Sequence, residues 1–163
     1  MTLLRTTFAL LPLALGAGCS AGTTSPPLGT INVTFPSVHA AIASDTLELH
    51  VFDASSPDTC IDLVQKRRTG QVLPKGLIDR TPVPTCDFLA GKSTPLDIAY
   101  GRRAFLVVAQ RQAQDLLIGC TIQGVGDAPI LVDVALITKD AMTSVPASSC
   151  VKLSDYCSGA CKN

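Results

Sequence analysis

The stretch RAFLVVAQRQAQDLLIGCTIQ, residues 103–123, decides the fold class of this chain. Its opening part, RAFLVVAQ, is apolar on both faces, as is typical of a strand in the middle of a sheet. The polar segment RQAQD then separates it from LLIGCTIQ, in which Ile118, Cys120 and Ile122 alternate onto one face. Because so short a connection fits a hairpin, the stretch predicts two neighbouring antiparallel strands.

The same alternation marks four other segments. In the clearest of them, TLELHVFD, Leu47, Leu49 and Val51 are expected to face the core, while Glu48 and His50 face solvent. A second short loop, GVGDA, predicts another hairpin before the last of these strands. The four segments are TINVTF (30–35), TLELHVFD (46–53), PLDIAY (95–100) and PILVDVALIT (129–138).

The segment SPDTCIDLVQKRRTG (56–70) instead carries the signals of one short helix. A Ser-Pro pair suits its first turn, the basic residues KRR suit its last turn, and Gly70 suits the position after it. The residues that follow, 70–94, are expected to form a surface excursion with a short strand near residues 83–89.

The composition also favours a β-protein. The carboxylates are twelve Asp and one Glu, and the chain holds 12 Gly and 11 Pro, residues that prefer turns to helix interiors. We therefore expect an all-β fold, an antiparallel β-sandwich of about six to seven strands over residues 30–140 with one short helix. An immunoglobulin-like strand order fits the same pattern.

The run PLDIAYGRRAFLVVAQ, residues 95–110, resembles prealbumin-like domains such as the regulatory modules of carboxypeptidases. The resemblance lies in an extended segment, a Tyr-Gly turn and a long apolar strand, and it is one of pattern only. It implies a β-sandwich. Tyr100 is also a candidate for a tyrosine corner, which is a structural role.

The N-terminus has the organisation of a secretory signal. Arg5 precedes an apolar run at residues 8–18, which is about 17 Å long as a helix and too short to span a bilayer. Small residues then lead into Cys19 within LALGAGCS, residues 13–20. This segment resembles the lipobox of bacterial lipoproteins, which signal peptidase II cleaves before the cysteine.

The lipobox resemblance implies that residues 1–18 are a signal peptide and that Cys19 becomes the lipidated first residue of the mature chain. Gly16 departs from the family, which prefers Leu at that position. The alternative is an ordinary signal peptide cut nearby, with Cys19 in a disulfide. If Cys19 carries two or three acyl chains, they anchor the chain to a membrane far more firmly than one chain could.

Ser20 follows the cysteine where Asp would favour retention in the inner membrane. The resemblance therefore implies an outer-membrane lipid anchor, facing the periplasm or the cell surface of a bacterium with two membranes. Residues 19–29 are expected to be a flexible tether. The net charge of zero gives no attraction to nucleic acid. The expected partners are the membrane, through the lipid on Cys19, and an envelope protein or a small ligand.

The number of cysteines supports the same assignment. The chain has seven, and lipidation of one leaves six, which form three disulfides in an oxidising compartment. Cys120 is expected to pair with Cys60, with Cys86 as the second choice. No Cys-x-x-Cys motif favours zinc. The six cysteines are Cys60, Cys86, Cys120, Cys150, Cys157 and Cys161.

Three of these cysteines lie in the tail, residues 141–163, which has few large aliphatic residues. We expect this Cys-rich tail to be ordered by its disulfides. Since three cysteines cannot all pair among themselves, at least one must bond to the β-rich domain. A local bond between Cys157 and Cys161 would leave Cys150 to pair with Cys86.

No set of residues predicts a catalytic site. His39 and His50 are both expected to be exposed, and no nucleophile motif accompanies them. Two basic clusters, KRR at 66–68 and RR at 102–103, are candidates for an anion-binding patch, although the preferred explanation is cations that complement a helix end and keep a strand start soluble. Four aspartates are candidates for a calcium site but match no loop motif: Asp97, Asp115, Asp127 and Asp133.

These observations predict a non-catalytic, membrane-anchored envelope lipoprotein that serves as a structural or interaction scaffold, with no metal and no cofactor. The alternative is a small-ligand- or carbohydrate-binding lipoprotein, which a pocket with converging polar groups would favour. We do not expect an enzyme, because no acid, base and nucleophile converge in the sequence pattern.

Overall fold

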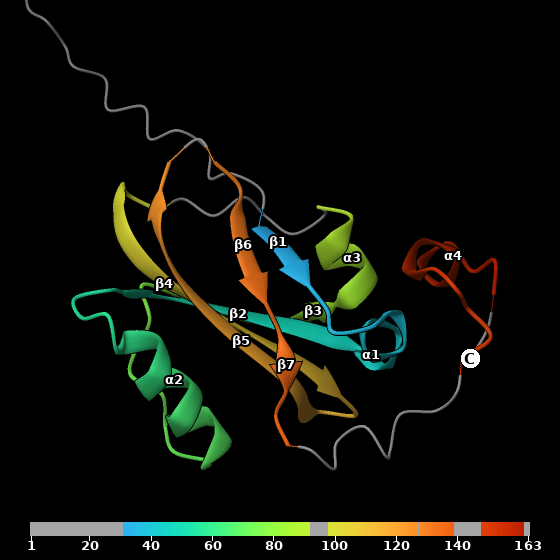
Figure 1. Ribbon diagram of the computed structural model, residues 1–163, viewed down its shortest axis with the longest axis horizontal. Helices are drawn as coiled ribbons and strands as arrows, with labels where there is room; N and C mark the ends of the chain where they lie inside the picture. The colour runs from blue at the N-terminus through green and yellow to red at the C-terminus, as the bar shows by residue number, and fades with distance from the viewer. Residues whose placement is uncertain (1–30, 92–97, 127, 139–147, 162–163) are drawn as a thin grey trace, which may run out of the picture.

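The structure is a computed structural model that describes residues 31–91, 98–126, 128–138 and 148–161 of the 163-residue chain. Within these residues it contains seven strands and four short helices (Figure 1). In chain order they are β1 (Ile31–Thr34), α1 (Val38–Ala43), β2 (Thr46–Asp53), α2 (Thr59–Arg68), β3 (Ile78–Pro84), α3 (Thr85–Leu89), β4 (Gly101–Arg111), β5 (Gln114–Val125), β6 (Ile130–Asp133), β7 (Ala135–Leu136) and α4 (Leu153–Cys157).

A five-stranded antiparallel sheet forms the centre of the molecule, with the strand order β3-β2-β4-β5-β7. The middle strand is β4, and its residues 104–109 are completely buried. This burial confirms the prediction of a central strand and explains why the segment is apolar on both faces, since each face of the sheet is covered.

The β4–β5 hairpin confirms the second half of that prediction. Arg111 pairs with Gln114, so the turn consists of Gln112 and Ala113 alone. Both adopt a positive φ, 50° and 62°, which is the conformation of a two-residue type I′ turn. Asp45 Oδ2 accepts a hydrogen bond of 2.7 Å from Gln112 N, which fixes the turn against the start of β2.

The hairpin predicted around residues 124–128 is wrong. β6 leaves β5 and pairs in parallel with β1 along its whole length. The chain returns to the large sheet only in β7, where Leu136 pairs with Leu117 of β5. The physical reason is burial, because Ile130 and Val132 of β6 pack onto the face of the large sheet and are almost fully buried there.

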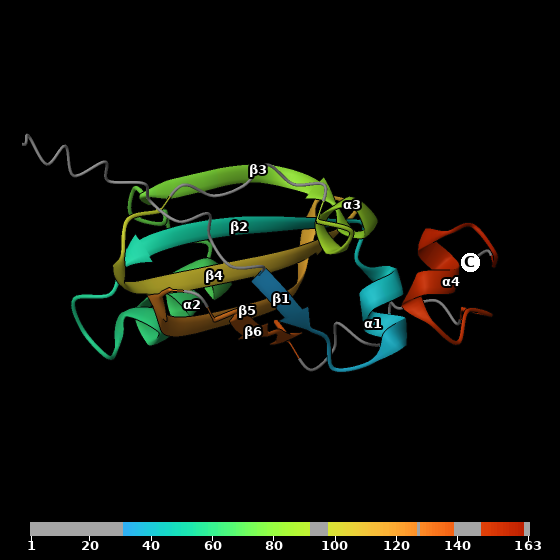
Figure 2. The same ribbon diagram turned by 90° about the horizontal axis from the view of Figure 1, so that it is seen from above.

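The two faces of the large sheet are covered by different elements. In Figure 1, β1 and β6 lie above the sheet and α2 lies below it. Phe105, Leu47 and Leu117 belong to the apolar cluster on the β1 and β6 side, to which α1 and α3 also contribute. Leu63 of α2 and Leu106 of β4 belong to the cluster on the other side. Figure 2 shows β3, β2, β4 and β5 side by side, with β1 crossing them and α1, α3 and α4 gathered at one end.

The expected all-β sandwich with one helix needs correction. Four helices occur in the described part of the chain, so the fold combines a β-sheet with helices. The second sheet is a two-stranded parallel one, and a sandwich of two antiparallel sheets is not confirmed. A β-rich architecture built on antiparallel pairing is confirmed.

Helix α2 confirms the one predicted helix, although it begins at Thr59, three residues after the expected cap. Ser56 Oγ instead accepts a hydrogen bond of 3.2 Å from Asp58 N in the turn that precedes the helix. At the other end Gly70 has a φ of 68°, and its N–H donates to the carbonyl of Arg67 at 3.1 Å. This left-handed glycine terminates the helix as predicted.

Neither α1 nor α3 was predicted: α1 lies between the first two predicted strands, and α3 lies where a short strand was expected near residues 83–89. Ser37 Oγ accepts a hydrogen bond of 3.1 Å from Ala40 N and caps α1, whose inner residues are buried. Strand β3 occupies the predicted surface excursion and ends at Pro84, where α3 begins and turns Phe88 into the core. The pattern at residues 83–89 is therefore a strand followed by a helix.

The strand predicted at residues 95–100 is absent from residues 98–100, the part of this segment that the structure describes. Ile98, Ala99 and Tyr100 form no strand, and residues 95–97 lie outside the described residues. Ile98 is nevertheless buried in the cluster beneath β1 and β6, whereas Tyr100 is 60% exposed.

Three disulfides pair all six cysteines of the described residues. Cys60–Cys120 joins α2 to β5, the pairing that the sequence favoured. Cys86–Cys157 joins α3 to α4 and so ties the tail to the β-rich domain, as expected. Cys150–Cys161 closes a short loop around α4.

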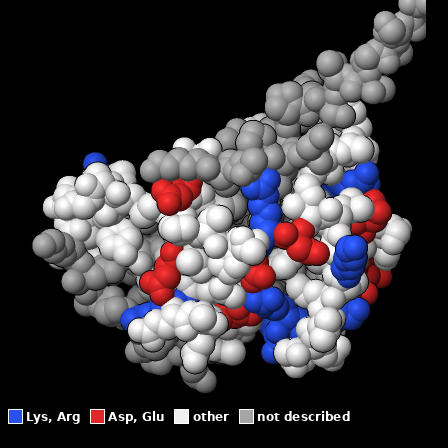
Figure 3. Space-filling view, turned by 180° about the vertical axis from the view of Figure 1, so that it is seen from behind, with Lys and Arg blue, Asp and Glu red and all other residues white. Residues whose placement is uncertain are grey.

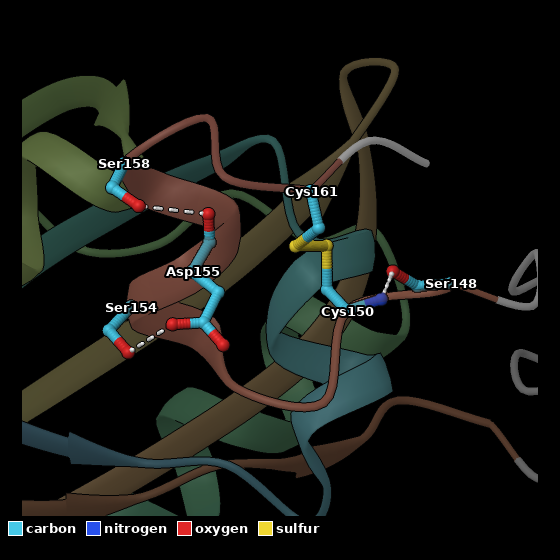
Figure 4. The surroundings of a disulfide bond; sticks show 6 residues. All are labelled: Ser148, Cys150, Ser154, Asp155, Ser158 and Cys161. Atoms are coloured by element: carbon cyan, nitrogen blue, oxygen red, sulfur yellow. Dashed lines mark hydrogen bonds between the residues drawn. A yellow bond between two sulfur atoms is a disulfide. The ribbon is translucent and has the colours of Figure 1, made fainter.

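The disulfides predicted for the tail are wrong. Cys157, not Cys150, bonds to Cys86, and Cys150, not Cys157, bonds to Cys161. Helix α4 was not predicted, and it places Cys157 at the end of the helix, where it reaches α3. Gly159, with a φ of 74°, then reverses the chain and brings Cys161 back to Cys150. Figure 4 shows this disulfide beside α4, where Ser158 Oγ donates a hydrogen bond of 3.1 Å to the carbonyl of Asp155.

The N-terminal predictions lie outside the described residues. They are the signal peptide at residues 1–18, the tether at residues 19–29 and the lipidation site Cys19. Among the described helices, none combines the length and the apolar character that crossing a bilayer requires.

Candidate functional site

Two features lie on the α2 side of the large sheet: a network of charged side chains and an open hollow. Leu63 and Arg67 are one helical turn apart, so both point from α2 toward the sheet. Leu63 is 3% exposed and packs into the apolar cluster, while Arg67 reaches the charged network. These two contacts set the position of α2 over β2, β4 and β5.

Arg67 joins two carboxylates from different strands. Its Nη2 atom lies 2.8 Å from Glu48 Oε2 of β2 and 2.9 Å from Asp115 Oδ1 of β5, and its Nε atom lies 2.5 Å from Asp115 Oδ2. The contact with Asp115 is bidentate, the arrangement in which guanidinium and carboxylate bond most strongly. Gln110 Nε2 of β4 adds a hydrogen bond of 3.1 Å to Asp115 Oδ1.

The network shifts the ionisation of its members in the direction that favours charge. Partial burial raises the pKa of Asp115, but the hydrogen bonds from Arg67 and Gln110 outweigh it, and the pKa lies below the ordinary value of an aspartate. The hydrogen bond with Asp115 in turn raises the pKa of Arg67. Both groups therefore remain charged at neutral pH.

His50 lies in the same network and is only 8% exposed. Its Nδ1 atom is 2.8 Å from Asp79 Oδ1 of β3, and its Nε2 atom is 3.0 Å from Glu48 Oε1 but lacks hydrogen-bond geometry with it. The prediction that His50 is exposed is therefore wrong. Side chains cover the outer face of β2, because Asp79 reaches His50 from β3 and Arg67 reaches Glu48 from α2.

This constellation has a histidine held by a carboxylate, but it lacks a nucleophile. In the described part of the chain, no serine, threonine or cysteine side chain hydrogen-bonds to His50, and the six cysteines there are disulfide-bonded. The described His, Cys, Asp and Glu residues also form no group of three arranged to hold a metal ion. What the network does chemically is bind α2 to the sheet through charge-assisted hydrogen bonds.

The arginines of the two basic clusters do not form one free anion-binding patch, because some of them are already bound to carboxylates. Arg67 is engaged by Glu48 and Asp115, and Arg103 Nη1 lies 2.6 Å from Asp53 Oδ1. Arg68, in contrast, is exposed and makes no ion pair with any described carboxylate. Figure 3 views the molecule from behind relative to Figure 1. On that face Lys and Arg are interspersed with Asp and Glu, so it carries no large patch of a single charge sign.

Beside α2 lies an open hollow with a volume of about 580 Å³. One wall is apolar, formed by Ile61, Val64 and the disulfide between Cys60 and Cys120. The rest of the lining comes from the last turn of the helix, where the side chain of Arg68 supplies the charge. The volume falls within the range of about 300–1,000 Å³ that is usual for small-molecule sites.

The other candidates from the sequence do not converge. His39 is exposed on α1, as predicted. Of the four aspartates proposed for calcium, Asp115 is bound to Arg67 and Asp133 is exposed on β6, while Asp97 and Asp127 lie outside the described residues. The interpretation of Asp115 as a calcium ligand is therefore wrong, because the guanidinium of Arg67 already occupies both of its oxygens.

Sequence reasoning missed the grouping of Glu48, His50, Arg67, Asp79 and Asp115. Glu48 and His50 were correctly placed on one face of β2, but that pattern does not show what covers the face. Asp79 lies in a segment that was not predicted as a strand, and its pairing opposite His50 appears only in the register of β2 with β3.

No protein-family model matches this chain, and neither a curated protein nor a solved structure is significantly similar to it. Function is therefore argued from the residues and the geometry described above.

Proposed function

We propose that this protein is a non-catalytic lipoprotein of the bacterial envelope, anchored in the outer membrane through Cys19, and that its β-rich domain serves as a scaffold for structural contacts or interactions. The domain would face the periplasm or the cell surface. The prealbumin-like β-sandwich implied by the sequence resemblance remains part of this proposal.

The observation that carries the proposal is the use of the cysteines. Three disulfides pair six of the seven cysteines of the chain, which leaves Cys19 without a cysteine partner in the same chain. Cys19 stands in the lipobox-like segment GAGC, directly after the apolar run of the signal. Disulfides themselves fit an envelope compartment, where thiols are oxidised.

A non-catalytic role is supported by the hydrogen-bond partners of the buried polar side chains. The more buried histidine, His50, lies between Asp79 and Glu48, of which Glu48 also binds Arg67 of α2. The network lacks a hydroxyl or thiol partner for His50 among the described residues. Nucleophilic catalysis needs such a partner within hydrogen-bond reach of its base.

Lipidation is tested on the protein produced in a bacterium with two membranes. Mass spectrometry of the mature N-terminus should find Cys19 as the first residue, carrying acyl chains, and the protein should fractionate with the outer membrane. Cys19→Ser should leave the chain uncleaved and unacylated. The matched control, Ser20→Ala, changes the neighbouring residue without removing the acylated sulfur and should fractionate like the wild type.

An unmodified Cys19, or a mature chain that begins at another residue, would sink the proposed anchoring. The absence of catalysis is tested separately. A turnover lost in His50→Gln while the melting temperature is unchanged would contradict it.

The second candidate function is binding of a small ligand, which the hollow beside α2 favours. The lining combines an apolar wall with the guanidinium of Arg68, which makes no ion pair with a carboxylate in the described part of the chain, and this combination is expected of a ligand site.

A further inference from the structure

We propose that the hollow beside α2 binds a small anionic amphiphile, a molecule with an apolar body and one carboxylate or phosphate group at its end. The proposal deepens the second candidate function and does not depend on lipidation of Cys19, because the lining residues all lie between Cys60 and Cys120.

The shape of the site follows from the periodicity of α2. Leu63 and Arg67 face the sheet, so Ile61, Val64 and Arg68 lie along the neighbouring face of the helix, toward the hollow. Arg68 lies seven positions after Ile61, which is about 10 Å along the helix axis. The stripe is apolar at its start and positive at its end.

The apolar part of this stripe is unusual for a solvent-facing helix surface. Ile61 is 64% exposed, and the Cys60–Cys120 disulfide lies next to it in the wall. Covering these groups with a hydrocarbon or aromatic body would remove apolar surface from water, which stabilises a complex by about 25 cal/mol per Å² buried, before the costs of association.

Arg68 selects for a negative group. It is exposed and makes no ion pair with the described carboxylates, whereas Arg67 and Arg103 in the same clusters both do. Its guanidinium is therefore free to bind a carboxylate or phosphate in a bidentate way. A neutral or cationic amphiphile would gain nothing from this contact.

The negative end of the helix dipole would oppose an anion here, but the carbonyl groups in the last turn are engaged. Thr69 N and Thr69 Oγ1 both donate to the carbonyl of Gln65, at 3.0 Å and 2.9 Å. The carbonyl of Lys66 accepts from Gln71 N at 2.9 Å. Because these carbonyl oxygens already accept hydrogen bonds, they repel an anion at this end of the site less strongly. The three basic residues of the last turn further offset the negative end of the helix dipole.

The site is also rigid before a ligand arrives. The Cys60–Cys120 disulfide fixes the first turn of α2 to β5, and the Arg67 network fixes its last turn to β2 and β5. A preformed wall lowers the ordering cost of binding. Both ends of the helix that lines the hollow are thus held, the first by a disulfide that is part of the wall and the last by a charged network outside the lining.

The test uses the full chain in isolated envelope membranes and two photoreactive probes. One probe is a single-chain fatty acid and the other is a lysophosphatidic acid, each with a diazirine in its chain. A fatty alcohol with the same diazirine is the neutral control. Labelled peptides are located by mass spectrometry, and half-saturation of labelling gives the apparent affinity of each probe.

We expect saturable labelling of the peptides that contain Ile61, Val64 or Cys120 by at least one anionic probe. The probe that labels more tightly identifies a free fatty acid or a phospholipid headgroup as the ligand source. Arg68→Gln should weaken labelling about tenfold, as expected for the loss of a charge-assisted contact. Gln65→Glu, which adds a negative charge at the same end, should weaken it similarly, and Arg68→Lys should retain most of it.

Arg102→Gln is the matched control, since Arg102 is also an exposed arginine without an ion pair to the described carboxylates but lies on β4 outside the lining. Unchanged melting temperature and unchanged disulfide maps show that the variants fold. Equal labelling by the fatty alcohol, equal affinity in Arg68→Gln, or labelling confined to other peptides would each overturn the proposal. Retention of outer-membrane anchoring in Cys19→Ser, with intact labelling, would refute only the anchoring role.

Discussion

At the residue scale, Arg67 is the side chain on which most of the polar contacts of the α2 face depend. It lies at the end of a short helix and yet reaches carboxylates on two strands, Glu48 and Asp115. Those carboxylates are mostly covered, with side chains 15% and 19% exposed. Removing one partner of a covered pair leaves the other charge without compensation, which costs more than the pair contributes.

The first prediction follows from this arrangement. Arg67→Gln should lower the free energy of unfolding by about 2–3 kcal/mol, because both carboxylates lose their main donor. Urea unfolding followed by circular dichroism measures the change. Lys66→Gln, the adjacent basic residue on the same helix, should change stability by less than about 0.5 kcal/mol. Equal effects of the two variants would show that the network contributes nothing specific.

The second prediction concerns pH. The folded-state pKa of Asp115 lies below its unfolded value of about 3.9. The stability that Asp115 contributes is therefore fully present above that value and is lost as the pH falls through the folded pKa. The wild type should lose stability below about pH 5 more steeply than Asp115→Asn, and the urea midpoints of the two should converge in acid. Parallel pH profiles would contradict the assignment.

At the scale of single elements, the crossing from β6 to β7 shows how one glycine permits the topology. Gly119 is buried in the middle of β5, and the backbone of Asp133 and Val134 passes directly over it. A Cβ at this position would overlap the carbonyl oxygen of Asp133. The chain can therefore leave the parallel pair with β1 and join the edge of the large sheet only because this strand position lacks a side chain.

The third prediction uses a control in the same strand. Gly119→Ala should destabilise the protein by about 2 kcal/mol or more, because the backbone that it meets cannot move aside without breaking the β5–β7 pairing. Gly124→Ala has no atom within 4 Å of its new Cβ and should be neutral or slightly stabilising. Thermal unfolding of both variants distinguishes steric overlap from a general preference for glycine in β5.

At the scale of the whole molecule, disulfides hold together parts that the apolar core does not. The tail contributes Cys150 to the buried residues, but none of the residues of α4 is buried. Cys86–Cys157 links residues 71 apart in the sequence, and Cys150–Cys161 links residues 11 apart. A crosslink that closes a longer loop removes more entropy from the unfolded chain.

The fourth prediction compares these two bonds. Replacing Cys86 and Cys157 by alanine should cost more stability than replacing Cys150 and Cys161, by about 1–2 kcal/mol. The first change should also make the tail susceptible to limited proteolysis, because it cuts the covalent link to α3. Peptide mapping without reduction should first confirm the three wild-type bonds. A map that joins Cys86 to Cys150 would contradict this tail structure.

Local sequence patterns predicted the features that need no distant partner. Residues 104–109 are apolar on both faces, which predicted the central position of β4, and the short polar connection after it predicted β5 beside it. The signals of α2 are equally local, since a basic last turn and a left-handed Gly70 need no distant partner. Cys120 was expected to face the core with Ile118 and Ile122, and Cys60, at the start of the predicted helix, was its first expected partner; the disulfide confirms this pairing.

Only the tertiary structure decided what covers each surface, because alternation tells which side of a strand is apolar but not what packs against the polar side. His50 is buried because β3, β4 and Arg67 surround it, although its own strand pattern pointed it toward solvent. β6 pairs with β1 rather than β5 because burying Ile130 and Val132 on the face of the sheet outweighs a local hairpin. The tail disulfides exchanged partners because α4 forms, and a five-residue helix that buries no side chain carries almost no signal in its own sequence.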